Sequence, residues 1–408
     1  MSDHTLHWQR NMYVCLFGSF TNVTAMTLLL PFLPIYVAHL GVRGHAEVVQ
    51  WSGIAYGITF LGAGLMAPVW GRFADLYGRK QILIRASLAM AICMSLIGVA
   101  QNIWQLVGLR LAAGVLGGYA SGAVVLVATQ TPRERAGWAL GVLSTGTMAG
   151  TLLGPLAGGI LPGLIGLRAT FFLAGAVIFV AFLATCFLIH EDREHLPTRA
   201  RHAARGAWSM IPDRRPVIAM LITAMLLMLA NMSIEPIITV YVAQLMPAGG
   251  NVVFTAGLVM AAAAVGSVMA APRLGRLADR IGHWNVIVMC LVACGVLLIP
   301  QAFVTNRWQL IGLRFLMGIS LSGLLPAIAA TIRHNVPQGG AGTILGYNTS
   351  AQYAGQVLGP VAGGFVGGHI GMRAVFLATT VIMFGGAAFN WSISRRLSAA
   401  RDADVAAR

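Results

Sequence analysis

Apolar stretches of about 20 residues, separated by short polar segments, fill most of this 408-residue chain. A stretch of that length crosses the hydrocarbon core of a bilayer as an α-helix. Residues 217–229 and 286–298 are almost continuously apolar, whereas the strands of a membrane β-barrel alternate polar and apolar side chains. Only 10% of the residues are charged, against roughly a quarter in soluble globular proteins. The sequence therefore predicts an all-α membrane protein.

We expect twelve transmembrane helices. Six lie in the first half, over residues 12–39, 50–71, 82–101, 104–128, 137–162 and 168–189. Six lie in the second half, over residues 216–244, 252–271, 285–304, 307–331, 342–366 and 372–394. These spans predict an N-terminal six-helix bundle over 1–189, a cytoplasmic linker loop over 190–215, a C-terminal six-helix bundle over 216–394 and a cytoplasmic tail over 395–408.

The distribution of positive charge predicts the orientation of these helices. Most of the 27 Lys and Arg residues fall in loops on one side of the spans, and the other side carries Arg43, Arg168, Arg307 and Arg373. Because Lys and Arg accumulate in cytoplasmic loops, both termini are expected in the cytoplasm. The placement of these charges in short loops favours membrane topology over nucleic-acid binding as the reason for the net charge of +15.

The two halves of the sequence repeat each other. Residues 67–75 (APVWGRFAD) match residues 271–279 (APRLGRLAD), and residues 104–110 (WQLVGLR) match residues 308–314 (WQLIGLR), in both cases 204 positions later. A third match, GPLAGG with GPVAGG, is 205 positions apart. Six helices per half leave the second copy parallel to the first, so the two bundles are expected to be pseudo-symmetric about an axis along the membrane normal.

Residues 71–80 (GRFADLYGRK), between the second and third spans, combine glycines, a carboxylate and three cations. This segment resembles the signature loop of the major facilitator superfamily, and the resemblance covers nearly the whole chain. In that family the loop is a latch that helps hold the cytoplasmic side closed. The resemblance implies a conformational latch made by Gly71, Arg72, Asp75, Gly78, Arg79 and Lys80, joined by Asp279 and Arg280 of the second copy. The alternative is a loop that only sets topology through its positive charge.

The second copy of this loop differs from the first. It has His283 and Trp284 where the first copy has Arg79 and Lys80. Because these replacements remove two permanent cations, we expect the second latch to be weaker than the first.

Glycines recur in the fifth span, at Gly141, Gly150, Gly154, Gly158 and Gly159, with Pro155 among them. The pattern resembles the motif of the family's antiporters, and residues 30–36 (LPFLPIY) resemble a motif of its twelve-helix drug/proton antiporters. Residues 128–146 and 271–282 resemble a multidrug resistance group of bacterial inner-membrane efflux pumps. The resemblance implies export, but such glycines also allow close helix packing, and the eleventh span repeats their spacing.

Few residues could couple transport to an energy source. A nucleotide-binding loop needs a lysine after glycine, whereas the single lysine, Lys80, follows Arg79. We expect no cofactor, so proton-driven secondary transport remains. Only one acidic residue, Glu235, lies within an apolar span, where low polarity disfavours the charged form of a carboxyl group. Glu235 is the predicted proton carrier or binding group for cationic drugs, and Asp75 or Glu47 could contribute instead. The alternative is a permanently neutral, structural Glu235.

Two arginines lie within spans. Arg110 lies six residues beyond Trp104, about 9 Å along a helix, where a charge is costly unless it faces protein or water. Its context resembles the family's fourth-helix motif, whose arginine is implicated in proton movement, and this implies a proton-coupling role. Bonding to backbone carbonyls is the structural alternative, which we favour for Arg314.

Polar side chains within the spans predict a substrate cavity. The predicted lining residues are Asn22 and Met26 in the first span, Asn231 and Glu235 in the seventh, and Asn348, Gln352, Tyr353 and Gln356 in the eleventh. Flexible methionine, aromatic rings and few charges suit many amphipathic ligands because such surfaces repack. The same polar side chains could instead bond neighbouring helices.

These observations predict a transporter rather than an enzyme. We expect proton-coupled antiport of structurally varied small drugs out of the cytoplasm, by a monomer in the bacterial inner membrane whose bundles rock about a central site. Its partners would be drugs, protons and membrane lipids. An importer or uniporter of a small nutrient is the first alternative, and a transporter-like receptor the second. The five cysteines lie in apolar spans, so neither disulfides nor a metal site is expected.

Overall fold

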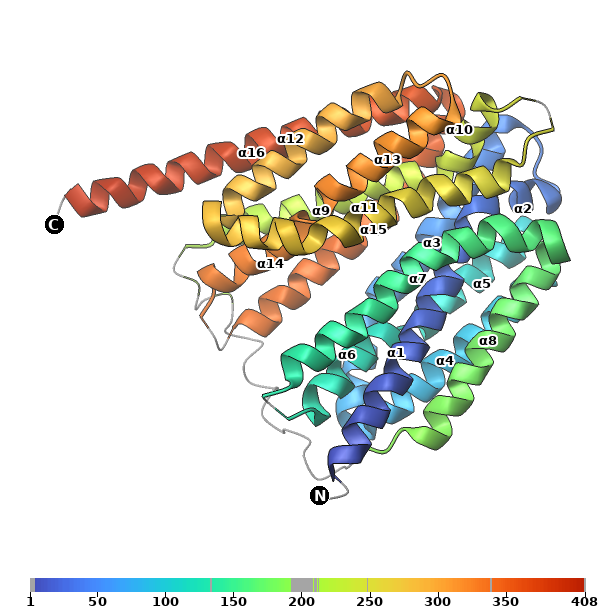
Figure 1. Ribbon diagram of the computed structural model, residues 1–408, viewed down its shortest axis with the longest axis horizontal. Helices are drawn as coiled ribbons and strands as arrows, with labels where there is room; N and C mark the ends of the chain where they lie inside the picture. Colours follow the sequence, from blue (N-terminus) through green and yellow to red (C-terminus); the bar gives the residue numbers. More distant parts are fainter. Residues whose placement is uncertain are drawn as a thin grey trace. The chain divides into compact units, whose positions relative to one another are not determined.

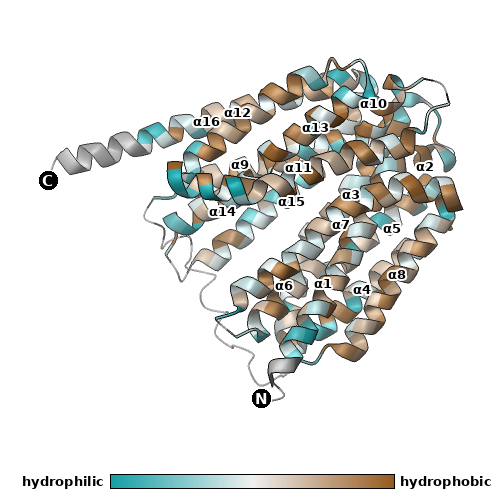
Figure 2. Ribbon diagram, in the orientation of Figure 1, coloured by the Kyte–Doolittle hydropathy of each residue, from teal (hydrophilic) through white to brown (hydrophobic). Residues whose placement is uncertain are grey.

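The computed structural model describes residues 4–132, 134–191, 208, 211, 213–247, 249–337 and 340–406. Within these ranges the chain forms α-helices and short 3-10 helices and no strand. Hydrophobic residues run along most of the helices, and hydrophilic residues gather at helix ends and in connections (Figure 2). The predicted all-α membrane architecture is confirmed.

The chain forms two compact units. The first comprises Met1–Leu196 and Pro236–Ala261, and the second comprises Pro197–Glu235 and Ala262–Arg408. The short segment after Glu235 therefore packs with the first half of the sequence. A hydrogen bond inside the first unit illustrates this packing, because Thr239 Oγ1 donates to the carbonyl of Pro31 at 2.9 Å. The predicted bundle boundaries stay a prediction, and most of the predicted linker lies outside the described residues.

The first unit contains the first six predicted spans (Figure 1). Its elements are α1 (His4–Leu28), η1 (Leu30–Phe32), α2 (Leu33–His39), α3 (His45–Tyr77), α4 (Arg79–Ile97), α5 (Ile103–Leu116), α6 (Tyr119–Gln130), α7 (Ala136–Ile165) and α8 (Leu167–Leu188). α10 (Ile238–Leu245) and the first part of α11 (Val252–Ile281) complete it. α7 runs alongside α1, and α8 alongside α4.

The second unit contains most of the other six spans. Its elements are α9 (Arg215–Ile234), the remainder of α11, α12 (His283–Gln301), α13 (Arg307–Leu321), α14 (Leu324–Asn335), α15 (Ala341–His369) and α16 (Met372–Ala406). α15 packs along α9, and α16 along α12. These pairs repeat the α7–α1 and α8–α4 pairs of the first unit, as the sequence repeat requires.

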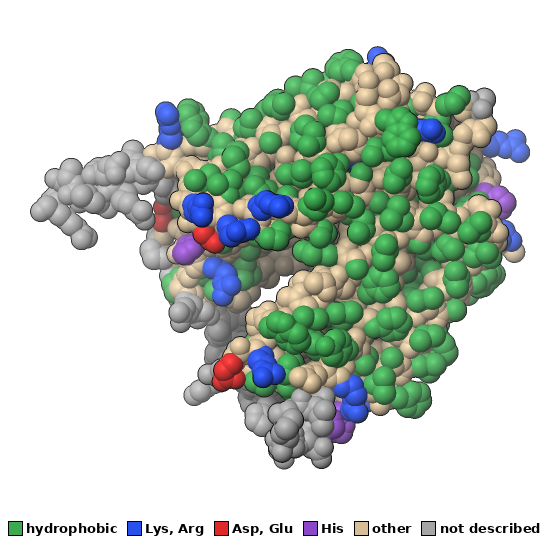
Figure 3. All heavy atoms as spheres, viewed as in Figure 1, with side chains coloured by type: hydrophobic (Ala, Val, Ile, Leu, Met, Phe, Trp, Pro, Cys, Tyr) green, Lys and Arg blue, Asp and Glu red, His purple; other side chains and the backbone are tan. Residues whose placement is uncertain are grey.

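Eleven helical segments in the described part of the chain are long and apolar enough to cross a membrane. The twelfth predicted span, α15, has 29 residues, more than the roughly 20 that a bilayer requires. Its polar side chains lower its mean hydropathy, which explains why it is not among the eleven. Hydrophobic side chains cover much of the face shown in Figure 3, and Lys and Arg gather toward the helix ends.

Four of the spans are broken, at positions that the repeat relates. The first and seventh are interrupted by 3-10 turns, η1 (Leu30–Phe32) and η4 (Glu235–Ile237). Pro31 and Pro236 lie in these turns, and proline removes a backbone donor that a continuous helix needs. The fourth and tenth spans break at residues 117–118 and 322–323. Gly118 has φ +104°, a conformation that favours glycine.

Several helices are longer than predicted. α3 continues through most of the predicted loop over residues 71–80, so that Gly71 is helical and only Gly78, with φ +95°, forms the turn before α4. Most of the predicted loop over residues 71–80 is therefore helical, because charged residues can extend a helix as well as end it. Likewise α16 extends through most of the predicted tail, to Ala406.

Candidate functional site

Glu235 lies at the break in the seventh span. α9 ends at Ile234, and η4 begins at Glu235, immediately before Pro236. The Glu235 side chain is half-buried, and it interacts electrostatically with Arg314 of α13. Glu235 and Arg314 both belong to the second unit. The structure therefore brings the one acidic residue of the apolar spans within electrostatic range of one of their two buried arginines.

Arg314 is almost completely enclosed by protein. Its side chain is 1% exposed, and its Nε and Nη2 atoms have no hydrogen-bond partner. A buried guanidinium group with unsatisfied donors is costly, so a nearby carboxylate stabilises it. The sequence analysis favoured a structural role for Arg314 and did not predict its interaction with Glu235. The sequence repeat, which places Arg314 at the position of Arg110, was the one indication that Arg314 could have a functional role.

Arg110, the counterpart in the first unit, has different surroundings. It is equally buried, but its Nε donates to the carbonyl of Ala55 at 3.2 Å. Its guanidinium carbon lies 5.7 Å from the centre of the Tyr56 ring. These contacts fit the structural alternative, bonding to a backbone carbonyl. The predicted role of Arg110 in proton coupling stays a prediction.

Polar side chains of α15 lie at several levels along α9, the helix that ends just before Glu235, and Gly363 of α15 meets Ser233 of α9. Gln356 Nε2 lies 3.5 Å from Met228 Sδ on α9. The Oδ1 atom of Asn348 and the Oε1 atom of Gln356 are buried without a hydrogen-bond partner. Unsatisfied buried acceptors are rare in folded proteins, and these two can accept hydrogen bonds from a ligand.

The other predicted cavity residues are distributed over both units. Asn231, Gln352 and Tyr353 are half-buried on α9 and α15 of the second unit. Asn22 and Met26 belong to α1 of the first unit. Asn22 Nδ2 donates to the carbonyl of Gly18 in its own helix, at 2.8 Å. The role of all these residues in binding substrate stays a prediction.

The turn between α3 and α4 includes a carboxylate that the sequence analysis did not identify. Glu191, just beyond α8, accepts hydrogen bonds from the backbone N–H groups of Arg79 at 2.7 Å and Lys80 at 2.8 Å. It therefore caps the N-terminus of α4, where unpaired N–H groups attract negative charge. A Cβ atom on Gly78 would come within 2.8 Å of Glu191 Oε2. Only glycine leaves room for this carboxylate.

The remaining predicted latch residues lie around this turn. Gly71 and Arg72 are exposed, and Arg79 and Lys80 are half-buried. The side chain of Asp75 lies outside the described residues, so its predicted roles in the latch and in proton coupling stay predictions.

The turn between α11 and α12 has the same backbone conformation as the turn between α3 and α4 and different side chains. Gly282 has φ +91°, and a Cβ atom there would meet nothing within 4 Å. His283 Nε2 lies 4.0 Å from Asp279 Oδ1, and its ring centre is 5.5 Å from that of His334. Asp279 and Arg280 are exposed. That this copy forms the weaker latch stays a prediction.

The glycines of α7 pack against α1. Cβ atoms at Gly150, Gly154 and Gly158 would collide with atoms of α1, among them the carbonyl oxygen of Leu28. Gly146, which the predicted motif omits, belongs to the same face, whereas Gly141 meets nothing within 4 Å. In the second unit α15 packs on α9 in the same manner through its own glycines, Gly355, Gly359 and Gly363. Close helix packing accounts for the repeated part of this motif.

Comparison with known families decides what this architecture is. The family model of the Major Facilitator Superfamily matches residues 15–294 and 250–405. The chain belongs to the major facilitator superfamily. Its membership explains the two related sets of six spans, since this superfamily is built from two such halves.

Relatives within the superfamily match the chain over almost its whole length. The multidrug resistance protein MdtG of Salmonella dublin is 42% identical over 395 residues, which cover 97% of this chain and 98% of that protein. MdtG of Salmonella typhi is similar to the same extent. The expected resemblance to a multidrug resistance group is confirmed, and the group is that of MdtG.

Solved structures of the superfamily share the fold. A bacterial homologue of the human lysosomal transporter Spinster, in an inward-facing and unoccupied conformation, has a TM-score of 0.74 at 15% identity and covers 97% of this chain and 98% of its own. A variant of the nucleoside transporter NupG has a TM-score of 0.76 at 14% identity and covers 94% of this chain and 99% of its own. At these identities the likeness concerns the fold alone.

Proposed function

We propose that this protein exports structurally varied amphipathic small molecules in exchange for protons. The observation that carries the proposal is the 42% identity, over 97% of the chain, to proteins named for multidrug resistance. The transport class follows from the superfamily, and the drug substrates follow from these relatives.

Glu235 is the proton carrier that we propose. Arg314 is a permanent cation and attracts the ionised Glu235 carboxylate across a medium of low polarity. Protonation of Glu235 removes this attraction and leaves the buried Arg314 without its counter-charge. Because a buried charge without a partner is costly, the two protonation states favour different arrangements of η4 and α13. A proton thereby shifts the conformational equilibrium, as a ligand with unequal affinity for two states does.

Competition at the same carboxylate gives exchange. A cationic drug neutralises Glu235 in place of the proton, so the two cannot be bound together. The unsatisfied Oε1 atom of Gln356, on the helix that packs along α9, offers a hydrogen-bond acceptor to a polar group of such a drug. The exchange of one cation for the other is antiport.

We also propose the membrane placement expected from the charge distribution. Both termini lie in the cytoplasm, the membrane is the bacterial inner membrane, and the protein acts as a monomer. The turn at Gly78 then faces the cytoplasm. With Glu191 as its cap, this turn is a cytoplasmic latch between the second, third and sixth spans.

Everted membrane vesicles from a strain that lacks its main efflux pumps test the function. Energised vesicles that contain the protein should accumulate cationic dyes and release them when a protonophore collapses the gradient. A drug panel in the same strain should show increased tolerance when the protein is expressed. Vesicles that never accumulate any dye, in a strain whose drug tolerance is unchanged, would refute export and leave nutrient import as the better hypothesis.

A further inference from the structure

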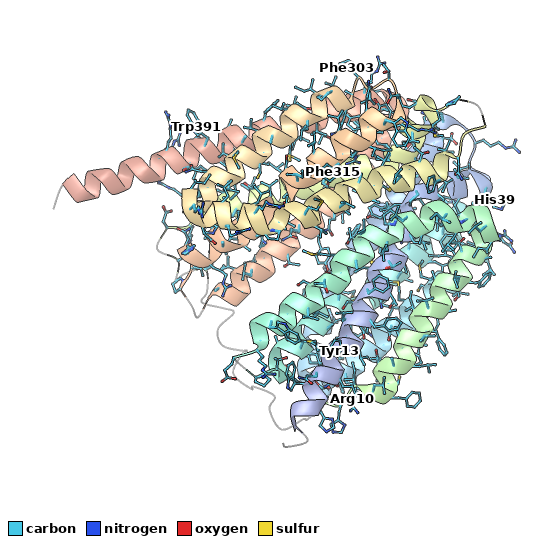
Figure 4. All side chains as sticks on the ribbon, in the orientation of Figure 1. Arg10, Tyr13, His39, Phe303, Phe315 and Trp391 are labelled. Carbon is cyan, nitrogen blue, oxygen red and sulfur yellow. The ribbon has the colours of Figure 1, made fainter. Side chains whose placement is uncertain are left out.

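An apolar groove lies on the second unit at the connection between α12 and α13. Its volume is about 710 Å³, and its lining includes Phe303, Val304, Trp308, Gly312 and Leu316. Phe303 and Trp308 are more than half exposed, at 56% and 64%. Figure 4 labels Phe303 near the end of α12, and Phe315, a further lining residue, on α13. The groove is thus an open, aromatic-rimmed hollow on a helix surface that is otherwise apolar.

Two arginines flank this groove. The guanidinium carbon of Arg307 lies 5.4 Å from the centre of the Trp308 ring, and that of Arg373 lies 5.9 Å from the centre of the Phe303 ring. Such cation–π contacts keep both cations beside the lining aromatic rings. The sequence contains no Asp or Glu between Arg280 and Arg401. The segments that form the groove therefore supply no carboxylate for these two cations.

The arrangement of charge and apolar surface along α13 matches a lipid. Arg307 is the first residue of α13. Gly312 and Leu316 follow at about 7.5 and 13.5 Å along the helix axis, within the depth of one leaflet of a hydrocarbon core about 30 Å thick. The groove therefore has cations at its mouth and an apolar floor that runs into the membrane. A phospholipid has the complementary order, an anionic phosphate followed by acyl chains.

We infer that this groove binds an anionic glycerophospholipid, whose phosphate lies between Arg307 and Arg373 and whose acyl chain lies along Gly312 and Leu316. With both termini in the cytoplasm, the lipid belongs to the outer leaflet. The site is specific to the second unit. Arg373 has a counterpart in Arg168, but the repeat places Ile103 at the position of Arg307. A single cation without its partner is a weaker anion site.

Native mass spectrometry of the delipidated full-length protein tests the site. The protein is titrated with equal amounts of phosphatidylglycerol, which is anionic, and phosphatidylcholine, which is zwitterionic. A cation near the membrane surface contributes enough to favour the anionic lipid by about fivefold. Wild type should therefore retain phosphatidylglycerol over phosphatidylcholine at least about fivefold. The double variant Arg307→Gln/Arg373→Gln should lose this preference, and the matched variant Arg168→Gln should keep it.

A second variant locates the acyl chain. A side chain at Gly312 would enter the groove, since a Cβ atom there meets nothing within 4 Å. Gly312→Phe should displace the lipid without disturbing the fold, whereas Gly108→Phe, at the open counterpart in the first unit, should not. Equal retention of the two lipids by wild type would overturn the inference. So would a preference that survives both Arg307→Gln/Arg373→Gln and Gly312→Phe.

Discussion

The two buried arginines of the spans occupy equivalent positions of the repeat but have different surroundings. Arg110 and Arg314 are both 1% exposed. Arg110 bonds the carbonyl of Ala55, lies over Tyr56 and has one unsatisfied nitrogen atom, Nη2. Arg314 has two unsatisfied nitrogen atoms and interacts with Glu235. The backbone framework is duplicated, but among the described residues a carboxyl partner for this arginine is found in the second unit alone. The difference supports the proposal that proton coupling belongs to the second unit, and the role of Arg110 stays a prediction.

The turn between α3 and α4 and the turn between α11 and α12 also differ in their side chains. Gly78 and Gly282 adopt nearly the same backbone conformation, with φ +95° and +91°. The first turn holds the Glu191 carboxylate against the start of α4. The position equivalent to Glu191 in the second half is occupied by Arg396, which cannot cap a helix N-terminus. Glycine forms the turn in both units, but in the described part of the chain only the turn at Gly78 is stabilised by hydrogen bonds to a distant side chain, that of Glu191.

The largest effect is expected at Glu235. Glu235→Gln keeps the shape of the side chain and removes its titration. Proton-driven accumulation of cationic dye in everted vesicles should fall to the level measured with a protonophore. Glu47→Gln, on an exposed residue in the first turn of α3, should accumulate dye as wild type does. Full accumulation by Glu235→Gln would remove this residue from the coupling mechanism and break the contrast between the two units.

The second largest effect is expected at the glycines that pack one helix against another, and it should be similar in the two units. Gly158→Ala and Gly363→Ala each push a methyl group against a backbone carbonyl of the packed helix, at Leu28 and at Ser233. Each should lower the free energy of unfolding by about 1–3 kcal/mol, seen as a lower midpoint of thermal unfolding in detergent. Gly141→Ala, which meets open space, serves as the control and should unfold as wild type does.

A double-mutant cycle sharpens the comparison of the arginines. The stabilities of Glu235→Gln, Arg314→Gln and the double variant should show an interaction free energy of about 0.5–3 kcal/mol, because each single change leaves one partner of the pair alone. The same cycle with Arg110→Gln should be additive to within about 0.5 kcal/mol. Comparable coupling in the two cycles, measured by thermal unfolding, would show that the structural distinction between the arginines is wrong.

The smallest effect distinguishes the two turns. Both Gly78→Ala and Gly282→Ala force alanine into a conformation that costs about 1–3 kcal/mol outside glycine. Gly78→Ala also displaces the Glu191 cap, which is worth about 1 kcal/mol. It should therefore have the lower unfolding midpoint. Glu191→Ala should reduce this difference between the two turns, and a difference that is unchanged in that background would exclude the cap as its cause.

Much of the fold could be predicted because it follows from local composition. Spans appear as apolar stretches, and duplicated segments such as 104–110 and 308–314 predict related halves. Glu235 could be singled out for the same reason, as the one acidic residue inside an apolar span. The ends of α3 and α16 could not be placed, because hydropathy marks where the membrane ends and not where a helix does.

The amino-acid sequence by itself determined that this protein crosses the membrane repeatedly, that its halves are related and which acidic residue lies within an apolar span. Only the tertiary structure decided which charges meet. Glu191 bonds Arg79 across 112 positions of the chain, and Glu235 interacts with an arginine of another span. Helix packing brings these partners together across long separations in sequence, and no local pattern of residues specifies them.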